Sequence, residues 1–204
     1  NLPDEQEKDT IHRYGMNEFR LFGLPAPEEG NVIGILGANG TGKTTAISLL
    51  AGEIIPNLGD WEEEGEWENV IDYYAGTDIQ KHFIGVADEK IRVALKPQYV
   101  DRIPKMFDGT LRELLENVAS TEKVNELAEK INITSLDKKV SKISGGELQK
   151  GAIAATLLKE ADLYFFDEPS SYLDIEQRIL MAKMISKLGE TKSVIVIEHD
   201  LAIL

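Results

Sequence analysis

Apolar residues first appear along the chain as short continuous runs. Val32–Leu36, Leu163–Phe166 and Val194–Ile197 are each typical of a strand that is buried on both faces of a parallel sheet. Arg92–Leu95 predicts another short strand, which ends before Pro97. The pattern therefore predicts a sheet core whose strands lie far apart in the sequence.

Apolar residues with helical spacing separate these runs. Lys43–Ala51 is interpreted as a helix that ends at Gly52. Thr110 and Glu113 form a capping box at the start of another helix. Two further apolar helix faces are formed by Val124, Leu127, Ala128 and Ile131, and by Met181, Met184, Ile185 and Leu188. Strands that alternate with helices predict a mainly parallel sheet with crossover helices.

The length of 204 residues fits one domain, residues 1–204. We expect a core lobe of about 18–104 and 160–204 and a helical lobe of about 105–159. Glu18–Leu24 is a candidate first strand, and the acidic stretch 57–69 is predicted to be a loop. Because the chain stops directly after a charged motif, we expect it to be a fragment of a larger protein.

Composition narrows the possible chemistry. Acidic residues number 36 against 22 basic ones, a net charge of −14, which disfavours general nucleic-acid binding but allows a local basic patch. The absence of cysteine excludes disulfides, thiolate catalysis, iron–sulfur clusters and cysteine-bound zinc within these residues. No apolar run reaches the length of a membrane span and no signal peptide opens the sequence, so we expect a cytoplasmic protein.

The segment Gly37–Thr44 matches the phosphate-loop pattern G-x-x-x-x-G-K-[ST] between a predicted strand and a predicted helix. Its backbone amides and the helix start suit phosphate oxygens, Lys43 would reach the β- and γ-phosphates, and Thr44 would bind Mg²⁺. A chance Gly-rich turn is the alternative. The pattern favours a site for ATP or ADP with Mg²⁺.

Two carboxylates follow the apolar run Leu163–Phe166. Asp167 would hold Mg²⁺, directly or through water, and Glu168 would act as general base toward an attacking water. An acidic loop after a strand is the alternative, and the phosphate loop makes it less plausible.

Three further segments are candidates for the same site. Ser144–Glu147 offers a second capping box, and its paired glycines suggest a close approach, with an anion as the natural occupant. Gln98 follows a predicted strand and could reach the metal ion or a water. His199 ends another strand. A lone Gln or His is usually structural, so these two count only together with the other motifs.

The order of these motifs, with Ser171–Asp174 after the carboxylates, resembles the nucleotide-binding domain of ABC-type ATPases. The resemblance implies a P-loop NTPase fold of the α/β class, with a mainly parallel core sheet, an antiparallel edge and a helical sub-lobe. It implies that Ser144–Glu147 is the signature motif, Gln98 the Q-loop and His199 the switch histidine. The residues expected to bind nucleotide are Asn39, Gly40, Thr41, Gly42, Lys43, Thr44, Thr45, Tyr14, Phe19, Ser144, Gly145 and Gly146.

Longer strings are similar to the first nucleotide-binding domain of the RNase L inhibitor family, ABC subfamily E. They include Lys96–Asp101, Tyr164–Asp174 and Glu198–Ala202. The family implies a cytoplasmic Mg²⁺-dependent ATPase that splits ribosomes with release factor, binds the small subunit and has no membrane domain. It also implies a second nucleotide-binding domain and an iron–sulfur domain. Both are absent here, so we interpret the chain as an excised first domain or a degenerate relative of one.

Several expectations depend on this resemblance. Tyr14 or Phe19 would stack on adenine, with core packing as the alternative. Ser144, Gly145 and Gly146 are predicted to contact the γ-phosphate of a nucleotide on a different domain, which would leave the isolated chain weak or inactive in turnover. Two other functions stay open: an ATPase subunit that energises a membrane transporter, and a nucleotide-gated binding module without turnover.

Overall fold

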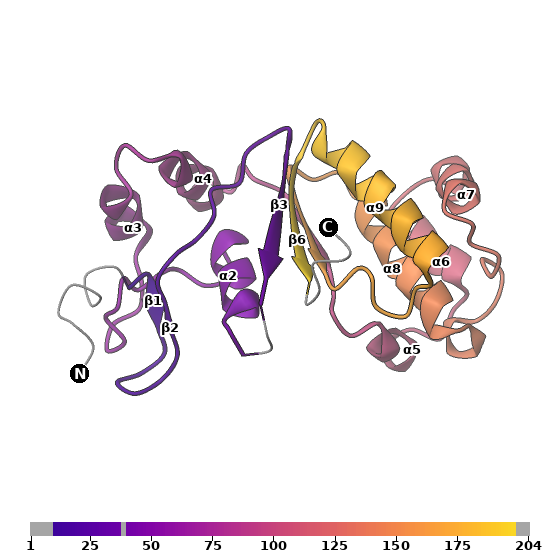
Figure 1. The fold of residues 1–204 in the computed structure, drawn as a ribbon, viewed down its shortest axis with the longest axis horizontal. Coiled ribbons are helices and arrows are strands. Elements are labelled where there is room, and N and C mark those ends of the chain that lie inside the picture. Colours follow the sequence, from indigo (N-terminus) through magenta and orange to yellow (C-terminus); the bar gives the residue numbers. More distant parts are fainter. Residues whose placement is uncertain (1–9, 38–39, 199–204) are drawn as a thin grey trace. The chain divides into compact units, whose positions relative to one another are not determined.

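The computed structural model describes residues 10–37 and 40–198 (Figure 1). The chain forms two compact units, one of residues up to 27 together with 37–91, the other of residues 28–36 together with those from 92 onward. These boundaries do not follow the two predicted lobes, and the division into a core lobe and a helical lobe stays a prediction.

The second unit contains a four-stranded parallel sheet. Its strands are β3 (Asn31–Leu36), β4 (Val93–Lys96), β5 (Leu163–Asp167) and β6 (Ser193–Glu198), in the order β3-β6-β5-β4. Phe165 lies opposite both Leu95 and Ile195, and all five residues of β5 are buried. The four strands that the apolar runs predicted for this sheet are confirmed. Because the strands are parallel, the carboxyl ends of β4, β5 and β6 meet at one edge of the sheet.

One expectation about the sheet is wrong. The run Val32–Leu36 was expected to be buried on both faces, but β3 is an edge strand of the described sheet. Val32 is 38% exposed and Leu36 is 41% exposed. An apolar run has the same sequence at the edge of a sheet as in its centre, so the pattern does not distinguish the two positions.

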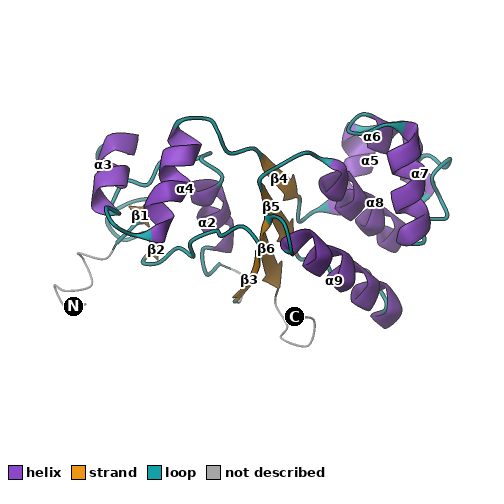
Figure 2. Ribbon diagram, turned by 90° about the horizontal axis from the view of Figure 1, so that it is seen from above, coloured by secondary structure: helices purple, strands orange, loops and turns teal. Residues whose placement is uncertain are grey.

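The helices of the second unit carry most of its core. They are η1 (Val100–Arg102), α5 (Ile103–Met106), α6 (Leu111–Glu116), α7 (Thr121–Lys130), η2 (Val140–Lys142), α8 (Gly145–Leu158) and α9 (Ile175–Gly189). In Figure 2, α5, α6, α7 and α8 lie together as one helical group. The capping box of Thr110 and Glu113 is confirmed, and Asp174 and Gln177 form another at the start of α9. The structure also contains helices α7 and α9 at the two segments where apolar helix faces were predicted.

Gly151 lies in the interior of α8, where glycine is unfavourable for helix stability. The structure gives a reason for glycine: a Cβ on residue 151 would lie 2.6 Å from Cδ1 of Leu111, the first residue of α6. Leu111 is fully buried. The leucine side chain thus occupies the space that a larger residue in α8 would fill.

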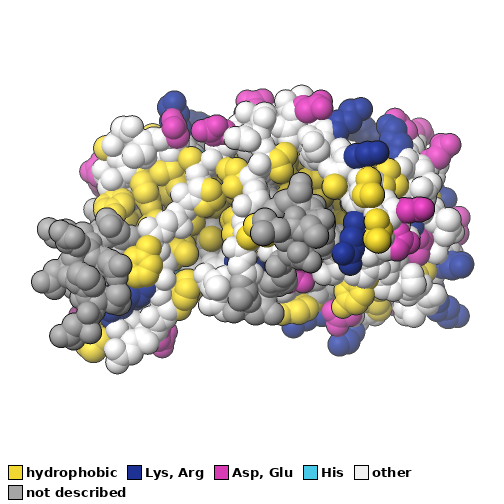
Figure 3. Space-filling view, viewed as in Figure 1, with side chains coloured by type: hydrophobic (Ala, Val, Ile, Leu, Met, Phe, Trp, Pro, Cys, Tyr) yellow, Lys and Arg dark blue, Asp and Glu magenta, His cyan; other side chains and the backbone are white. Residues whose placement is uncertain are grey.

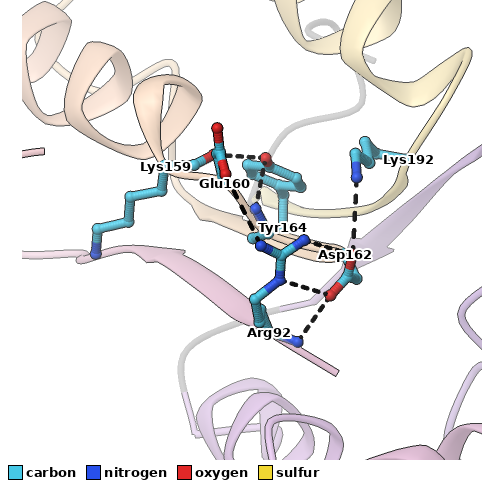
Figure 4. Close-up of polar contacts among 7 residues, drawn as sticks. Arg92, Lys159, Glu160, Asp162, Tyr164 and Lys192 are labelled. Carbon is cyan, nitrogen blue, oxygen red and sulfur yellow. Dashed lines mark hydrogen bonds and ion pairs between the residues drawn. The ribbon is translucent and has the colours of Figure 1, made fainter. Parts of the chain in front are cut away.

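Arg92 and Asp162 tie the amino-terminal ends of β4 and β5 together (Figure 4). Nε and the backbone N–H of Arg92 donate to Oδ2 of Asp162 over 3.2 and 3.0 Å, and Lys192, before β6, lies 3.8 Å from Oδ1. These bonds hold the pKa of the Asp162 carboxyl below its usual range. Tyr164 adds a hydroxyl bond of 2.7 Å to the Lys159 carbonyl. The network stabilises the sheet at the end opposite to its carboxyl edge.

Within its described residues, the first unit contains an antiparallel pair of strands and three helices. They are β1 (His12–Arg13), β2 (Arg20–Leu21), α2 (Lys43–Leu50), α3 (Trp67–Tyr73) and α4 (Asp78–Ala87). The two strands form a sheet of their own. The predicted strand 18–24 is only two residues long, α3 begins inside the predicted loop 57–69, and α4 was not predicted. Phe83 of α4 is fully buried against Trp67, with 5.9 Å between ring centroids.

On the face seen in Figure 3, basic and acidic side chains are interspersed over the helices of the second unit. No helix in the described part of the chain is long and apolar enough to cross a membrane.

Candidate functional site

The predicted site residues are distributed over both units. The phosphate loop and the two aromatic candidates belong to the first unit, whereas Gln98, Ser144, Asp167 and Glu168 belong to the second. Asn39 and His199 lie outside the described residues.

The phosphate loop leads directly into α2. Gly40 and Gly42 have φ angles of 81° and 88°, in the left-handed region that favours glycine. At Gly42 a Cβ would also overlap the ring of Phe19. Both backbone conformation and space therefore require glycine at position 42.

Lys43 is the first residue of α2 and turns back toward the start of the loop. Its Nζ donates to the carbonyl oxygen of Gly37. Thr44, the next residue, is exposed. An ammonium group that spans the loop, followed by an exposed hydroxyl at a helix start, is an arrangement that suits a polyphosphate with its metal ion.

Two aromatic side chains adjoin this loop. The hydroxyls of Tyr14 and Thr45 are 3.2 Å apart, and Tyr14 is 47% exposed. One edge of the Tyr14 ring packs against His12, with 4.9 Å between centroids. Phe19, as described, packs against Gly42. Both predicted aromatics thus lie beside the phosphate loop.

The two carboxylates of the second unit stand at the carboxyl end of β5. Asp167 is the last residue of the strand and is 9% exposed. Glu168 has a φ of 47°, which is uncommon for a residue with a side chain, and its N–H donates to the carbonyl of Ile197 in β6 over 2.9 Å. The backbone therefore adopts a left-handed conformation at Glu168, directly after the end of β5.

The Glu168 carboxylate is held at both oxygens. Nε2 of Gln98 donates to Oε1 over 2.7 Å, and Oγ of Ser171 donates to Oε2 over 3.3 Å. Gln98 follows the end of β4, the neighbour of β5. The structure therefore brings two sequence-predicted residues, Gln98 and Glu168, into direct contact.

Two residues that the sequence analysis did not single out also bind at this turn. Nζ of Lys96 donates to the carbonyls of Asp167 and Glu168 over 2.7 and 3.4 Å, and Nε2 of Gln149 donates to the carbonyl of Glu168 over 2.7 Å. Burial lowers the pKa of Lys96 to about 8, although Asp167, Glu168 and Glu198 oppose that shift. A polar residue two positions before Gln98, in an otherwise apolar strand, is the signal that could have found Lys96.

Ser144 begins α8 in the predicted way. Its Oγ accepts the N–H of Glu147 over 3.2 Å. The second half of the predicted capping box is not formed, because the Glu147 carboxylate accepts the N–H of Thr134 over 3.1 Å and pairs with Lys150. Burial is the largest single influence and opposes ionisation of Glu147, but the hydrogen bond and charge of Lys150, together with hydrogen bonds from Ser135 and Thr134, lower the pKa of its carboxyl overall. The serine cap is confirmed and the reciprocal glutamate cap is wrong.

Gly145 and Gly146 bring the start of α8 close to Tyr172. A Cβ on Gly146 would lie 3.0 Å from the carbonyl oxygen of Tyr172, and one on Gly145 would lie 3.3 Å from its ring. Tyr172 itself is exposed, with a φ of 64°. The paired glycines thus allow the start of α8 to pack closely against the segment that follows the carboxylates.

The donor set contains few metal-binding side chains. In the part of the chain that the structure describes, no group of three or more His, Cys, Asp and Glu side chains could hold a metal ion by itself. The candidate ligands are one carboxylate, one amide and one hydroxyl, from Asp167, Gln98 and Thr44. Mg²⁺ is commonly held by one or two protein oxygens together with phosphates, and these are oxygen donors. These side chains, Asp167 and Gln98 in the second unit and Thr44 in the first, are oxygen donors of the kind that Mg²⁺ prefers.

Comparisons with known proteins match this architecture. The family model described as ABC transporter matches residues 27–171. The chain is 44% identical to ABC transporter E family member 1 and 34% identical to E family member 3, both of Arabidopsis thaliana, and 42% identical to translation initiation factor RLI1 of Saccharomyces cerevisiae. These alignments cover 100%, 78% and 100% of the chain and 34%, 78% and 35% of the relatives, in that order.

Solved structures give the same result. The chain is 50% identical to an archaeal ribosome recycling factor, aABCE1, crystallised with the ribosomal stalk protein aP1, and 48% identical to an RNase-L inhibitor. Each superposes with a TM-score of 0.88, over 97% and 96% of this chain and 38% of each relative. The chain thus spans about a third of the length of most of these relatives. It belongs to the ABC transporter family and, within it, to the E family that includes the RNase L inhibitor, as an ABC-type nucleotide-binding domain.

Proposed function

We propose that this chain is the ATP-binding and ATP-hydrolysing domain of a twin-domain protein that splits and recycles ribosomes. The observation that carries the catalytic part is the Glu168 carboxylate, which follows the end of β5 and accepts a hydrogen bond from Gln98 over 2.7 Å. The ribosomal part rests on relatives whose names give translation initiation and ribosome recycling.

The phosphate loop is proposed to bind the nucleotide through its amides and Lys43. Tyr14 is the better candidate for stacking on adenine, because its ring is about half exposed, whereas Phe19 packs against Gly42. Phe19 would then support the loop from behind. The proposed nucleotide contacts near the loop are Asn39, Gly40, Thr41, Gly42, Lys43, Thr44 and Thr45.

Mg²⁺ is proposed to bind at oxygens of Thr44, Gln98 and Asp167. The Gln98 amide donates through Nε2 to Glu168, which leaves its oxygen for the cation. When bound, Mg²⁺ neutralises charge on the β- and γ-phosphates.

Glu168 is proposed to accept a proton from the attacking water. The water oxygen bonds to the γ-phosphorus, the bond from that phosphorus to the β–γ bridging oxygen breaks, and ADP leaves while the proton stays on the Glu168 carboxylate. Gln98 would hold Oε1 of that carboxylate in place. His199 is proposed to contact the γ-phosphate.

The start of α8 is proposed to serve a nucleotide bound to a second domain. Ser144 is exposed at the amino end of a 14-residue helix, an end that favours anions. Ser144, Gly145 and Gly146 would contact the γ-phosphate only when two domains close on each other. Turnover would then require the partner domain.

The intact protein is proposed to be cytoplasmic and to act with the small ribosomal subunit and release factor. It would carry the second nucleotide-binding domain and an iron–sulfur domain outside these residues.

The test uses the full-length protein with post-termination ribosomes, release factor and ATP, and measures separation of the subunits by light scattering. The wild type should separate them, and Glu168→Gln should bind ATP and stay on the small subunit. ATP turnover without subunit separation would contradict the ribosomal role and favour a transporter ATPase. ATP binding without turnover would favour a nucleotide-gated binding module.

A further inference from the structure

The carbonyl oxygen of Glu168 is held by two donors from different elements. Nζ of Lys96 comes from β4 and Nε2 of Gln149 from α8, at 3.4 and 2.7 Å. Lys96 also binds the preceding carbonyl, that of Asp167, over 2.7 Å. Two consecutive carbonyls at the end of β5 are therefore fixed by side chains that are themselves fully buried.

Glu168 needs such support because its backbone conformation is unfavourable. Its φ of 47° lies in the left-handed region, which is unfavourable for a residue with a side chain. Pro169 follows it and further restricts the conformations open to this residue. Without fixed donors on its carbonyl, the chain would relax at this position, and the direction of the carboxylate would change with it.

Both donors are costly residues to bury. An ammonium group in the core is unfavourable unless it is well paired, and Lys96 meets main-chain carbonyls there. The Oε1 atom of Gln149 is buried and has no hydrogen-bond partner within residues 10–37 and 40–198. An apolar side chain at either position would avoid these costs. What the two polar side chains share is the Glu168 carbonyl.

We propose that Lys96 and Gln149 are positioning residues for Glu168: they hold its carbonyl so that the carboxylate stays directed toward Gln98 in the orientation required for catalysis. This inference rests on the proposed role of Glu168 as the general base. The two residues act through Glu168 and have no proposed contact with the nucleotide.

The test uses Lys96→Met and Gln149→Met in the full-length protein, since methionine keeps much of the length and removes the donor. Because misplacement of a reacting group costs up to about 10²-fold in rate, each change should lower kcat about 10- to 100-fold. ATP affinity should stay within about threefold, because the phosphate-binding groups are untouched.

A double-mutant cycle with Glu168→Gln separates positioning from a general structural role. If both residues act through the carboxylate, Lys96→Met and Gln149→Met should lower kcat no further once Glu168→Gln is present. Thr156→Val is the matched control, because it also removes a buried hydrogen bond from α8, that of Thr156 to Ala152, and leaves Glu168 untouched. Its kcat should equal that of the wild type.

The outcomes distinguish the two proposals. If Glu168→Gln alone leaves hydrolysis at the wild-type rate, the base assignment fails. If Glu168→Gln lowers hydrolysis to a small residual rate but both methionine variants keep kcat within threefold of the wild type, the positioning role is overturned. It is also overturned if they lower kcat as much in the Glu168→Gln background as in the wild type. Should Lys96→Met fail to fold, Gln149→Met alone decides by the same criteria.

Discussion

Nε2 of Gln98 lies 2.7 Å from Oε1 of Glu168, although the two residues are 70 positions apart in the sequence. The parallel pairing of β4 with β5 explains this contact. Lys96 lies opposite Phe166, and Gln98 and Glu168 each follow two residues later. The amide and the carboxylate are therefore delivered to the same edge by the sheet itself. This relationship connects the fold to the chemistry proposed for it.

Lys43→Ala should weaken MgATP binding. Loss of a hydrogen bond to a charged group costs about 1.5–3 kcal/mol, so the Kd should rise about 10- to 100-fold. Isothermal titration calorimetry measures this directly. Lys81→Ala, at an exposed lysine of the same unit, is the control and should leave the Kd unchanged. An unchanged Kd for Lys43→Ala would contradict the assignment of the phosphate loop.

Ser144→Arg should separate nucleotide binding from turnover. The arginine would block the start of α8 against a partner domain but leave this domain's own phosphate loop intact, so the MgATP affinity should change little. Turnover that depends on the partner should be lost. For the isolated chain, turnover should be slow and should rise more than linearly with protein concentration if the chain pairs with itself. A concentration-independent ATPase that Ser144→Arg does not affect would refute a site shared between domains.

Gly151→Val should destabilise the second unit. The added side chain would overlap Leu111, and overpacking of a core typically costs about 1–3 kcal/mol. Chemical denaturation should show this loss in the free energy of unfolding. The double variant with Leu111→Ala should be less destabilised than the sum of the two single changes, because the alanine makes room for the valine. Strict additivity would mean that the two residues do not compete for the same space.

His82 should make stability depend on pH. Burial lowers the pKa of His82 below its ordinary value of 6.5, while its bond to the Leu50 carbonyl opposes the shift. The unfolded chain therefore takes up the proton first, so the stabilisation is complete above pH 6.5 and declines as the pH falls below it. The free energy of unfolding should fall less in His82→Gln than in the wild type between about pH 7 and pH 5. If the free energy of unfolding fell equally with pH in both proteins, His82 would not be buried in its neutral form.

Local patterns predicted much of the fold. The apolar runs gave β4, β5 and β6, and the residue pair Thr110 and Glu113 gave the start of α6, because these signals depend only on near neighbours. The helix α4 was missed although Ile79, His82 and Phe83 have helical spacing, since one member of that face is a polar residue. The exposure of β3 depends on which strands flank it, and that is a tertiary property.

The residues of the candidate site also fall into those that local motifs predicted and those that only the tertiary structure reveals. The phosphate loop, the Ser144 cap and the carboxylate pair follow from short motifs whose residues are adjacent in the sequence. The contacts of Lys96 and Gln149 with Glu168 join residues 72 and 19 positions apart, and they depend on the register of β4 with β5 and on the packing of α8. Sequence spacing alone contains no information on these contacts.

Glu168 is proposed to be the base for hydrolysis of ATP held by this domain. The most direct measurement is the identity of the bound nucleotide after the full-length protein, with any second phosphate loop inactivated, is mixed with γ-labelled ATP. For Glu168→Gln we expect the nucleotide to stay a triphosphate, bound within about threefold of the wild-type affinity, because the change removes the proton acceptor and keeps the binding groups. Release of labelled phosphate at the wild-type rate would contradict the role of Glu168 as the base.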